Sequence, residues 1–295
     1  MVEPVIDAPT AAVLTQPRRR VFEWTVVVAA LVYSLAFVYF EWSGAAAYLL
    51  AVLPVILAAM VGKTWLAAAF TAMLPMYFLI GHATAGWPHY TPSLALDNAM
   101  PLTPQWIFVY ASLYVCGFML PLLVVRGREL FQQALKAYLF VMVISYAGFY
   151  LYPTIAPRDE GLAVRDFSTW LLKLFYDIDQ PYGCFPSLHV AYSFVAAMAC
   201  YRMHRGVGIA AAIWSALIAV STVYTKQHYV IDAVVGGLEA PLAYAIFLRG
   251  RPRDGVPAGD RQLAPRRALN AAAVYAAMIA GFWVAYQLGA GGANG

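Results

Sequence analysis

Two histidines stand in short polar stretches at the ends of long hydrophobic segments. The first, His189, closes the stretch 183–189, which includes a serine, and the second, His228, lies about forty residues later within the stretch 221–232. A helix that begins at the first stretch presents free backbone N–H groups, which attract anions. Histidines next to such a helix start, with a lysine and Asp232 close in the sequence, predict a site that handles phosphate groups.

His228 and Asp232 are spaced i and i+4, so on a helix their side chains share one face. A carboxylate in that position can accept the proton of one ring nitrogen, which fixes the tautomer and leaves the other nitrogen basic. A histidine nucleophile or general base is prepared in this way. The alternative is a buried polar pair whose two members only satisfy each other.

His189 belongs to a different helix and could divide the work with His228. When two histidines face a phosphate, one attacks phosphorus and the other gives a proton to the leaving oxygen. Phosphoryl transfer spreads negative charge over the non-bridging oxygens, so cations are needed nearby. Lys226 precedes His228 by two residues, and Arg158 follows the hydrophobic segment 135–152. Both are candidate phosphate ligands, with a cation that merely reaches interfacial water as the alternative.

Three further residues are candidates for contact with a substrate. Glu239 lies seven residues after Asp232, on the same helical face but deeper in the hydrophobic segment. Ionisable side chains are costly there, so Glu239 either binds substrate or makes a structural hydrogen bond. Tyr224 and Tyr229 belong to the second polar stretch. Three residues of the other outer loop could contact a headgroup, although we expect solvated side chains there: His82, His89 and Asp97.

A metal site is an alternative use of the two histidines and the carboxylate, since zinc accepts such ligands. The sequence offers no second carboxylate or cysteine cluster beside His189, His228 and Asp232. The cations Arg158 and Lys226 would repel a metal ion. We therefore predict chemistry without a metal and without another cofactor.

Composition places these groups in a membrane protein. Hydrophobic residues make up 62% of the 295 residues and charged residues only 12%, against roughly 25% charged residues in soluble domains. A spanning helix needs about 20 mostly apolar residues. Nine segments meet this requirement: 21–40, 45–62, 64–80, 105–125, 135–152, 187–203, 207–224, 229–248 and 268–288. We predict an all-α, polytopic helix bundle of about nine spans, the first too long for a signal-peptide core and therefore retained.

The basic residues predict the orientation of this bundle. With the N-terminus in the cytoplasm, the outer segments hold only four of the 19 Lys and Arg: Arg158, Arg165, Lys173 and Lys226. This bias follows the positive-inside rule and puts both polar stretches on the outer face, as in a bacterial inner membrane with the site toward the periplasm. Basic residues confined to clusters beside hydrophobic segments argue against nucleic-acid binding.

The outer loop that precedes the first polar stretch contains one further predicted helix. Apolar residues of the segment 166–176 fall on one helical face: Phe167, Trp170, Leu171 and Leu174. This pattern predicts a short amphipathic helix, either lying in the membrane interface or packed as an ordinary loop helix.

The chain resembles the type 2 phosphatidic acid phosphatase superfamily, and more narrowly its inositol phosphorylceramide synthase branch. The resemblance rests on three stretches in the family's order at helix ends: 153–158 with its arginine, Pro186-Ser187-Leu188-His189, and 221–232 ending in His-x-x-x-Asp. It implies a six-helix catalytic core within 97–248 and no metal. The flanking parts are then a cytoplasmic tail 1–20, N-terminal membrane helices 21–96, a basic cytoplasmic linker 249–267, and a C-terminal membrane helix and tail 268–295.

The resemblance also implies a role for each matching residue. His228 would be the nucleophile that forms a phosphohistidine, oriented and charge-stabilised by Asp232. His189 would be the general acid for the leaving group and then the base for the acceptor. Ser187 and Arg158 would bind phosphate oxygens.

Three departures from the phosphatase pattern favour the synthase-like branch. Leu188 stands where the phosphatases usually have glycine, and Thr222 stands where they have arginine, with Lys226 as a possible replacement. The fuller first motif, Lys-x6-Arg-Pro, is absent. Tyr224 and the run Gln227-His228-Tyr229 agree with the synthase-like reading.

We therefore expect a membrane enzyme that takes a phosphoryl-headgroup unit from a lipid phosphoester and transfers it to a lipid alcohol or to water. Candidate donors are phosphatidylinositol-like lipids, phosphatidate and polyprenyl phosphates, and the runner-up function is a lipid phosphate phosphatase. A transporter or a non-catalytic lipid binder is a further alternative. That class would spread charged residues over several spans or show inverted repeats, and the sequence has neither pattern.

Overall fold

The computed structural model describes residues 65–159, 161–250 and 258–289, which fold into helices and loops with two isolated β-bridges. The chain forms two units, Met1–Pro75 and Met76–Gly295. The predicted spans 21–40 and 45–62 lie outside the described residues. All candidate site residues belong to the second unit.

The predicted segment 64–80 contains two helices instead of one. α3 (Trp65–Met73) ends before Pro75, and α4 (Met76–Thr84) begins after it. Proline lacks the N–H that a helix interior needs, and it disfavours the helical conformation in the residue before it. The hydrophobic pattern continues through this break, which is why the sequence predicted a single span.

Among the described residues, five helical segments are long and apolar enough to cross a membrane: Pro104–Val124, Arg128–Leu151, Arg205–Tyr224, Val230–Leu248 and Ala264–Gln287. Each corresponds to a predicted span. The largest difference is at α8 (Arg128–Leu151), which begins before Leu135 because its first turns, although partly polar, bury Leu130 and Ala134. The all-helical membrane architecture is therefore as predicted, while the total of nine spans and the six-helix core remain predictions.

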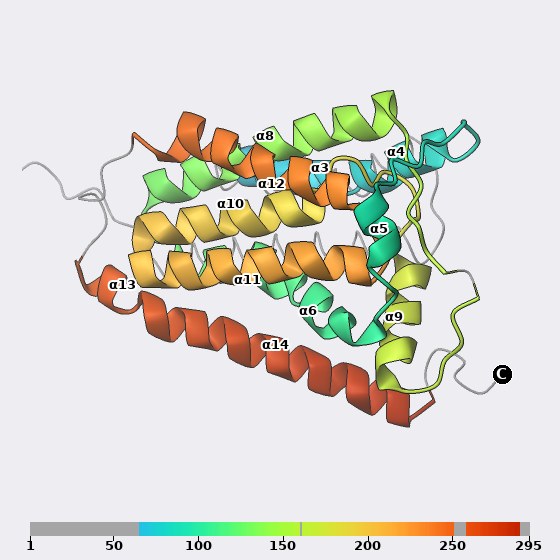
Figure 1. Cartoon of the computed structure of the whole chain (residues 1–295). Helices are drawn as coiled ribbons and strands as arrows, with labels where there is room; N and C mark the ends of the chain where they lie inside the picture. Colours follow the sequence, from blue (N-terminus) through green and yellow to red (C-terminus); the bar gives the residue numbers. More distant parts are fainter. Residues whose placement is uncertain (1–64, 160, 251–257, 290–295) are drawn as a thin grey trace, which may run out of the picture. The chain divides into compact units, whose positions relative to one another are not determined.

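The shorter helix α10 (Leu188–Met203) lies at the centre of the second unit. It packs against α8, α11 (Arg205–Tyr224) and α12 (Val230–Ala243), and Figure 1 shows these helices side by side. Small side chains allow the close approach, because Ala191, Ala196 and Ala199 are fully buried. α10 is thus surrounded by other helices, and its first turn carries His189.

The segment 104–124 is not a uniform α-helix, because it contains a 3-10 turn and a π-helical turn. It runs through η1 (Pro104–Trp106), α6 (Ile107–Ala111), the π-helical turn η2 (Tyr114–Met119) and α7 (Leu120–Val124). Pro121 has no N–H for the carbonyl four residues earlier, that of Gly117. The Tyr138 hydroxyl of α8 donates to that carbonyl instead, so the proline creates a hydrogen bond between two helices.

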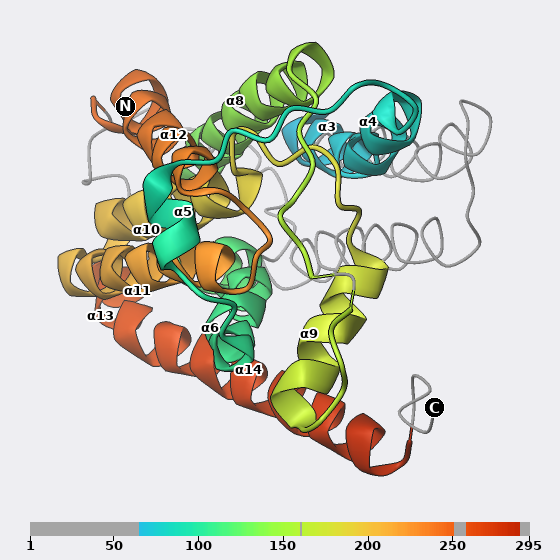
Figure 2. The same ribbon diagram turned by 45° about the vertical axis from the view of Figure 1, so that its right-hand side comes forward.

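Helix α9 (Phe167–Ile178) lies across one end of the bundle, near the end of α14 (Ala264–Gln287) (Figure 2). Asp166 caps it by accepting a hydrogen bond from Thr169 N at 2.9 Å, and this bond, with one from the Ser168 hydroxyl, lowers the pKa of the Asp166 carboxyl. Of the predicted apolar face, Trp170 and Leu171 are buried, and Phe167 and Leu174 are partly buried and pack against the same cluster. Leu172 and Phe175 are buried as well.

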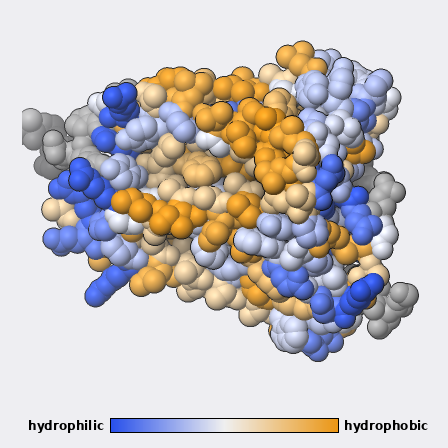
Figure 3. All heavy atoms as spheres, viewed as in Figure 1, coloured by the Kyte–Doolittle hydropathy of each residue, from blue (hydrophilic) through white to orange (hydrophobic). Residues whose placement is uncertain are grey.

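The surface is divided as a membrane protein requires. Figure 3 shows apolar side chains over the middle of the helices and hydrophilic side chains at both ends. Large apolar side chains of the spanning helices are exposed, among them Ile213, Leu238 and Leu269. Exposed apolar surface of this kind is stable against lipid and would be unfavourable in water.

The hydrogen bond that Pro121 makes necessary can be tested with Tyr138→Phe. The substitution leaves the Gly117 carbonyl without its hydroxyl partner inside the bundle, which costs about 1–3 kcal/mol. We expect the melting temperature of the detergent-solubilised protein, followed by circular dichroism, to fall by several degrees. Tyr150→Phe, at an exposed position of the same helix, should leave it unchanged. An equal melting temperature in both variants would contradict the account.

Candidate active site

His189 and His228 are in direct contact, although they come from different elements. His189 lies in the first turn of α10, and His228 lies in the loop between α11 and α12. His189 Nδ1 is 2.9 Å from His228 Nε2, and His228 is only 4% exposed. The structure thus brings together the two histidines that the sequence placed in one site.

The partners of His228 decide which of its nitrogens is basic. Its Nδ1 is 3.0 Å from the Cys184 carbonyl oxygen, and a carbonyl only accepts, so Nδ1 carries the proton. A neutral His228 therefore has its lone pair on Nε2, the atom that faces His189. The hydrogen between the two rings then belongs to His189 Nδ1.

Asp232 lies beside this arrangement and is fully buried. Its Oδ2 is 3.5 Å from His228 Nδ1 and accepts a hydrogen bond from Tyr229 N at 2.9 Å. The sequence predicted that this carboxylate would accept the ring proton itself. In the structure the Cys184 carbonyl is closer, and Asp232 supplies negative charge next to the protonated nitrogen.

Sequence reasoning missed the Cys184 carbonyl and the residue that holds it. Thr154, fully buried just past α8, accepts hydrogen bonds at its hydroxyl from Cys184 N and Phe185 N, both at 3.0 Å. The Thr154 carbonyl accepts a further bond from Gly183 N. The first polar stretch is in this way fixed against the loop that contains Arg158. No residue-type signal could have revealed a backbone carbonyl as the partner of His228.

Ser187 joins the start of α10 to α12. Its N–H donates to the Asp232 carbonyl at 3.0 Å, and its hydroxyl caps α10 by accepting from Val190 N at 3.4 Å. The backbones of α10 and α12 approach so closely here that a Cβ at Gly236 would lie 2.2 Å from the Ser187 carbonyl oxygen. Glycine at 236 therefore sets the distance between the helices that carry His189 and Asp232.

Arg158 is almost buried and most of its donors are occupied. One terminal nitrogen donates to the carbonyls of Tyr176 and Asp179, and the other to the Gln180 carbonyl and to Gln227 Oε1 at 2.5 Å. The carboxylate of Asp179 is 3.6 Å away. The guanidinium thus binds the carbonyls at the end of α9 and reaches the residue next to His228.

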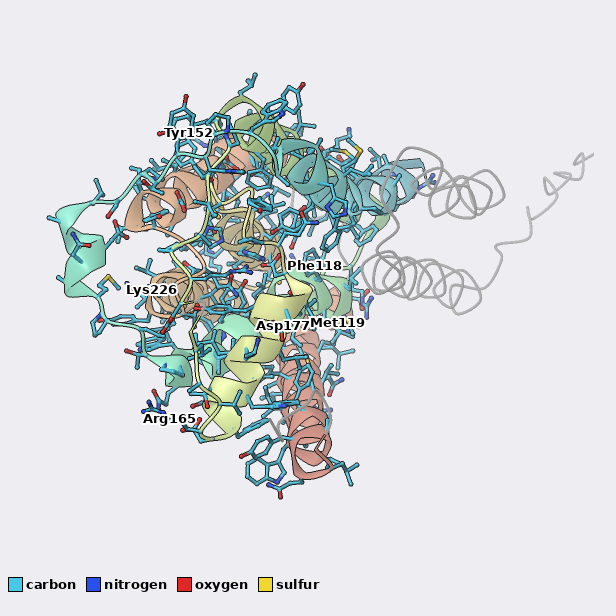
Figure 4. All side chains as sticks on the ribbon, turned by 90° about the vertical axis from the view of Figure 1, so that its right-hand side faces the viewer. Phe118, Met119, Tyr152, Arg165, Asp177 and Lys226 are labelled. Atoms are coloured by element: carbon cyan, nitrogen blue, oxygen red, sulfur yellow. The ribbon has the colours of Figure 1, made fainter. Side chains whose placement is uncertain are left out.

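Lys226 turns away from the histidines. Its ammonium donates to the carbonyls of Met100 at 2.6 Å and Asp97 at 3.1 Å, at the end of α5 (Ala95–Ala99), and Figure 4 shows it on the side of the bundle that faces α5. Its backbone has φ 55°, the left-handed conformation that commonly follows a helix end. In this structure the ammonium supports the loop.

Asp97 has a defined structural role and is not a solvated loop residue as expected. Its side chain is buried and accepts hydrogen bonds from Val230 N at 2.8 Å and Leu94 N at 2.7 Å. It therefore satisfies a free N–H at the start of α12, where a negative charge is also favourable. The sequence could not predict this contact, because Asp97 and Val230 are 133 residues apart along the chain.

The candidates for substrate contact occupy three different places. Tyr224 stacks on Trp106 with ring centroids 5.3 Å apart, and Tyr229 precedes α12 and is buried, which raises the pKa of its hydroxyl to about 12. Glu239 is buried between α12 and α8, where Ser145 Oγ donates to Oε2 at 3.1 Å. Its other oxygen, Oε1, has no hydrogen-bond partner in the described part of the chain.

Apolar spanning helices, with a buried pair of histidines and an aspartate at one end, indicate an integral membrane protein with a candidate histidine-based site. The family model of the PAP2 superfamily matches residues 87–246, more than half of the chain. The protein belongs to this superfamily, whose members are phosphatases and phosphotransferases, and it is an enzyme of that general lipid phosphatase type. Comparisons with curated proteins and with solved structures give no match.

The contact at Gly236 predicts a sharp difference between two neighbouring glycines. Gly236→Ala places a methyl group against the Ser187 backbone, so the two helices must separate and the histidines with them. We expect the variant to lose most turnover and to melt at a lower temperature. Gly237→Ala is the matched control, because its Cβ would meet Val190 at an ordinary 3.8 Å. Equal behaviour of the two variants would exclude a special role of this contact.

The support of the Cys184 carbonyl can be tested with Thr154→Val. The valine has nearly the same shape but leaves two buried N–H groups without an acceptor, at about 1–3 kcal/mol each. We expect turnover to fall roughly ten- to a hundredfold as the loop shifts under His228. Thr154→Ser keeps the hydroxyl and should retain activity. Loss of activity in the serine variant as well would point to packing rather than hydrogen bonding.

Proposed function

We propose that this protein transfers a phosphoryl-headgroup unit between lipids through a phosphohistidine on His228. One observation carries the proposal: His228 Nε2, with its proton fixed on Nδ1 by the Cys184 carbonyl, faces His189 Nδ1 at 2.9 Å. A nucleophile and a proton donor are thus aligned on one axis, as an in-line displacement at phosphorus needs.

The reaction would take two steps. In the first, His228 Nε2 forms a bond to phosphorus and the bond to the leaving oxygen breaks. His189, which takes up a second proton when the anionic phosphate group binds beside it, gives one proton to that oxygen and becomes neutral. In the second, the hydroxyl of the acceptor attacks phosphorus, His189 takes its proton, and the phosphorus–nitrogen bond breaks. Asp232 stabilises the positive charge on the His228 ring in the intermediate.

Substrate must separate the two rings before this chemistry. Reacting atoms sit about 3–3.5 Å apart in a productive complex, and the contact of 2.9 Å between the nitrogens leaves no room for a phosphorus atom. The phosphate group would replace the bond between the histidines and bind at the start of α10, beside Ser187 and the positive end of the helix dipole. The described structure is then the resting state.

Burial favours transfer to a lipid alcohol over hydrolysis. His228 is 4% exposed and Asp232 is fully buried, so bulk water has little access to the nucleophile. The positive charge at the site is also small, because Lys226 binds loop carbonyls and Arg158 lies 3.6 Å from Asp179. A singly charged phosphodiester, such as a phosphatidylinositol-like donor, needs less positive charge than a phosphate monoester. These points support the inositol phosphorylceramide synthase-like reading.

The runner-up is a lipid phosphate phosphatase acting on phosphatidate or a polyprenyl phosphate, which superfamily membership allows equally.

For either function we propose that the site faces the periplasm of a bacterial inner membrane. Supporting this, the site end carries Arg158, Arg165, Lys173 and Lys226, whereas Arg126, Arg128, Arg202, Arg205 and further arginines stand at the other helix ends. We propose that the reaction needs no metal.

The test uses the purified full-length chain in detergent with a chelator present. Lipid phosphodiesters and phosphomonoesters are offered with and without diacylglycerol or ceramide, and products are followed by mass spectrometry. We expect a new phospholipid only when the acceptor is present. His228→Ala should lower turnover by a factor on the order of 10³ or more, and His82→Ala, at an exposed position of α4, should not.

Each departure from this pattern has a distinct meaning. Free phosphate formed without acceptor would select the phosphatase. Turnover that stops with the chelator and returns with a metal would refute the metal-free reaction. Unchanged turnover in His228→Ala, or the lack of a phosphorylated protein stable in alkali when labelled donor is added, would refute the phosphohistidine.

A further inference from the structure

Gln227, the residue before His228, is the most unusual polar side chain at this site. It is 2% exposed, and its Oε1 accepts a hydrogen bond from an Arg158 terminal nitrogen at 2.5 Å. Arginine can only donate, so the amide oxygen must face Arg158 and the amide nitrogen must point away from it. That nitrogen, Nε2, is buried and has no hydrogen-bond partner among the described residues.

A buried amide without an acceptor is costly, at about 1–3 kcal/mol, and rare in folded proteins. The orientation cannot relax, because Arg158 is itself held by the carbonyls of Tyr176, Asp179 and Gln180. Donors fixed in advance where charge develops are a common means of stabilising a transition state. Arg158 Nε is buried and lacks a partner within the described ranges too. Two buried N–H groups, one of them on the residue before His228, are therefore held in place for an acceptor that the described part of the chain does not supply.

The ligand expected from the sequence at this point is occupied elsewhere. Lys226 was the predicted cation of the second polar stretch, and its ammonium binds the Asp97 and Met100 carbonyls instead. The next residue along the chain turns its side chain to Arg158. The left-handed backbone at Lys226 separates the two directions, so that one residue supports α5 and the other reaches the site.

We propose that the Gln227 side-chain amide, together with Arg158 Nε, binds a non-bridging oxygen of the phosphate group and takes the place of Lys226 as the phosphate ligand of the second stretch. The proposal rests on the proposed function, because it assumes that phosphate meets His228. It specifies a neutral donor in addition to the arginine, for a phosphate group carried by any lipid. Gln227 is then a direct substrate ligand and also orients Arg158.

Two substitutions separate these roles. Gln227→Glu keeps an oxygen for Arg158 but removes the N–H and adds a negative charge. Gln227→Met stays neutral and nearly isosteric but removes both the N–H and the contact with Arg158. Only the loss of the N–H donor is common to both variants. Gln262→Glu, at an exposed position of α13 (Ala258–Gln262), adds the same charge outside the site and serves as the control.

The probe is inorganic phosphate, titrated into the purified full-length protein in detergent and followed by calorimetry, with lipid turnover measured in parallel. We expect both Gln227 variants to bind phosphate roughly 10- to 100-fold more weakly than wild type, as for the loss of a hydrogen bond to a charged group. Gln262→Glu should bind as wild type. Thermal unfolding of all variants shows whether they fold.

The outcomes distinguish this inference from the proposed function. If Gln227→Glu binds phosphate as tightly as wild type, Gln227 only holds Arg158 and the inference is wrong, even when His228→Ala abolishes turnover. If both folded variants weaken phosphate binding, the amide is a ligand. If His228→Ala keeps full turnover, the phosphohistidine fails, whatever Gln227 does to phosphate affinity.

Discussion

The approach of α12 to the first turn of α10 is the contact on which the site depends. One backbone hydrogen bond, from Ser187 N to the Asp232 carbonyl, joins the two helices, and Gly236 allows their backbones to come this close. Because His189 stands two residues after Ser187 and His228 stands four before Asp232, this crossing fixes both histidines at once. The helices surrounding α10 prevent it from moving away, and the small buried residues of α10 itself allow them to pack closely around it.

The two cations near this crossing bind mainly backbone carbonyls, and Arg158 also forms one ion pair, with Asp179. Arg158 binds three carbonyls at the end of α9, and Lys226 binds two at the end of α5. Each cation therefore satisfies carbonyls that a helix end leaves free, with favourable electrostatics at that end. The result is a rigid rim with little net positive charge. A phosphate group would meet oriented N–H donors and one guanidinium.

The sequence predicts what depends on local spacing and misses what depends on distant segments. The i, i+4 spacing of His228 and Asp232 and the apolar face of α9 are local, and the described structure has both. The break at Pro75 is also local, but a hydropathy pattern contains no information about a missing N–H, so it predicted one continuous span. Asp97 illustrates the other kind, because it bonds to Val230 N, 133 residues further along the chain. The Cys184 carbonyl could not be predicted at all, since every residue has one.

The placement of ionisable groups argues for catalysis over transport. A transport path requires polar groups at successive depths along several spans. In the described part of the second unit, His189, His228, Asp232 and Arg158 gather at one end of the helices, and Glu239 is a carboxylate deeper in, bonded to Ser145. Groups that share one level and face one another are placed to act together on a single bound headgroup. That arrangement suits a headgroup held at the membrane surface while its acyl chains stay in the lipid.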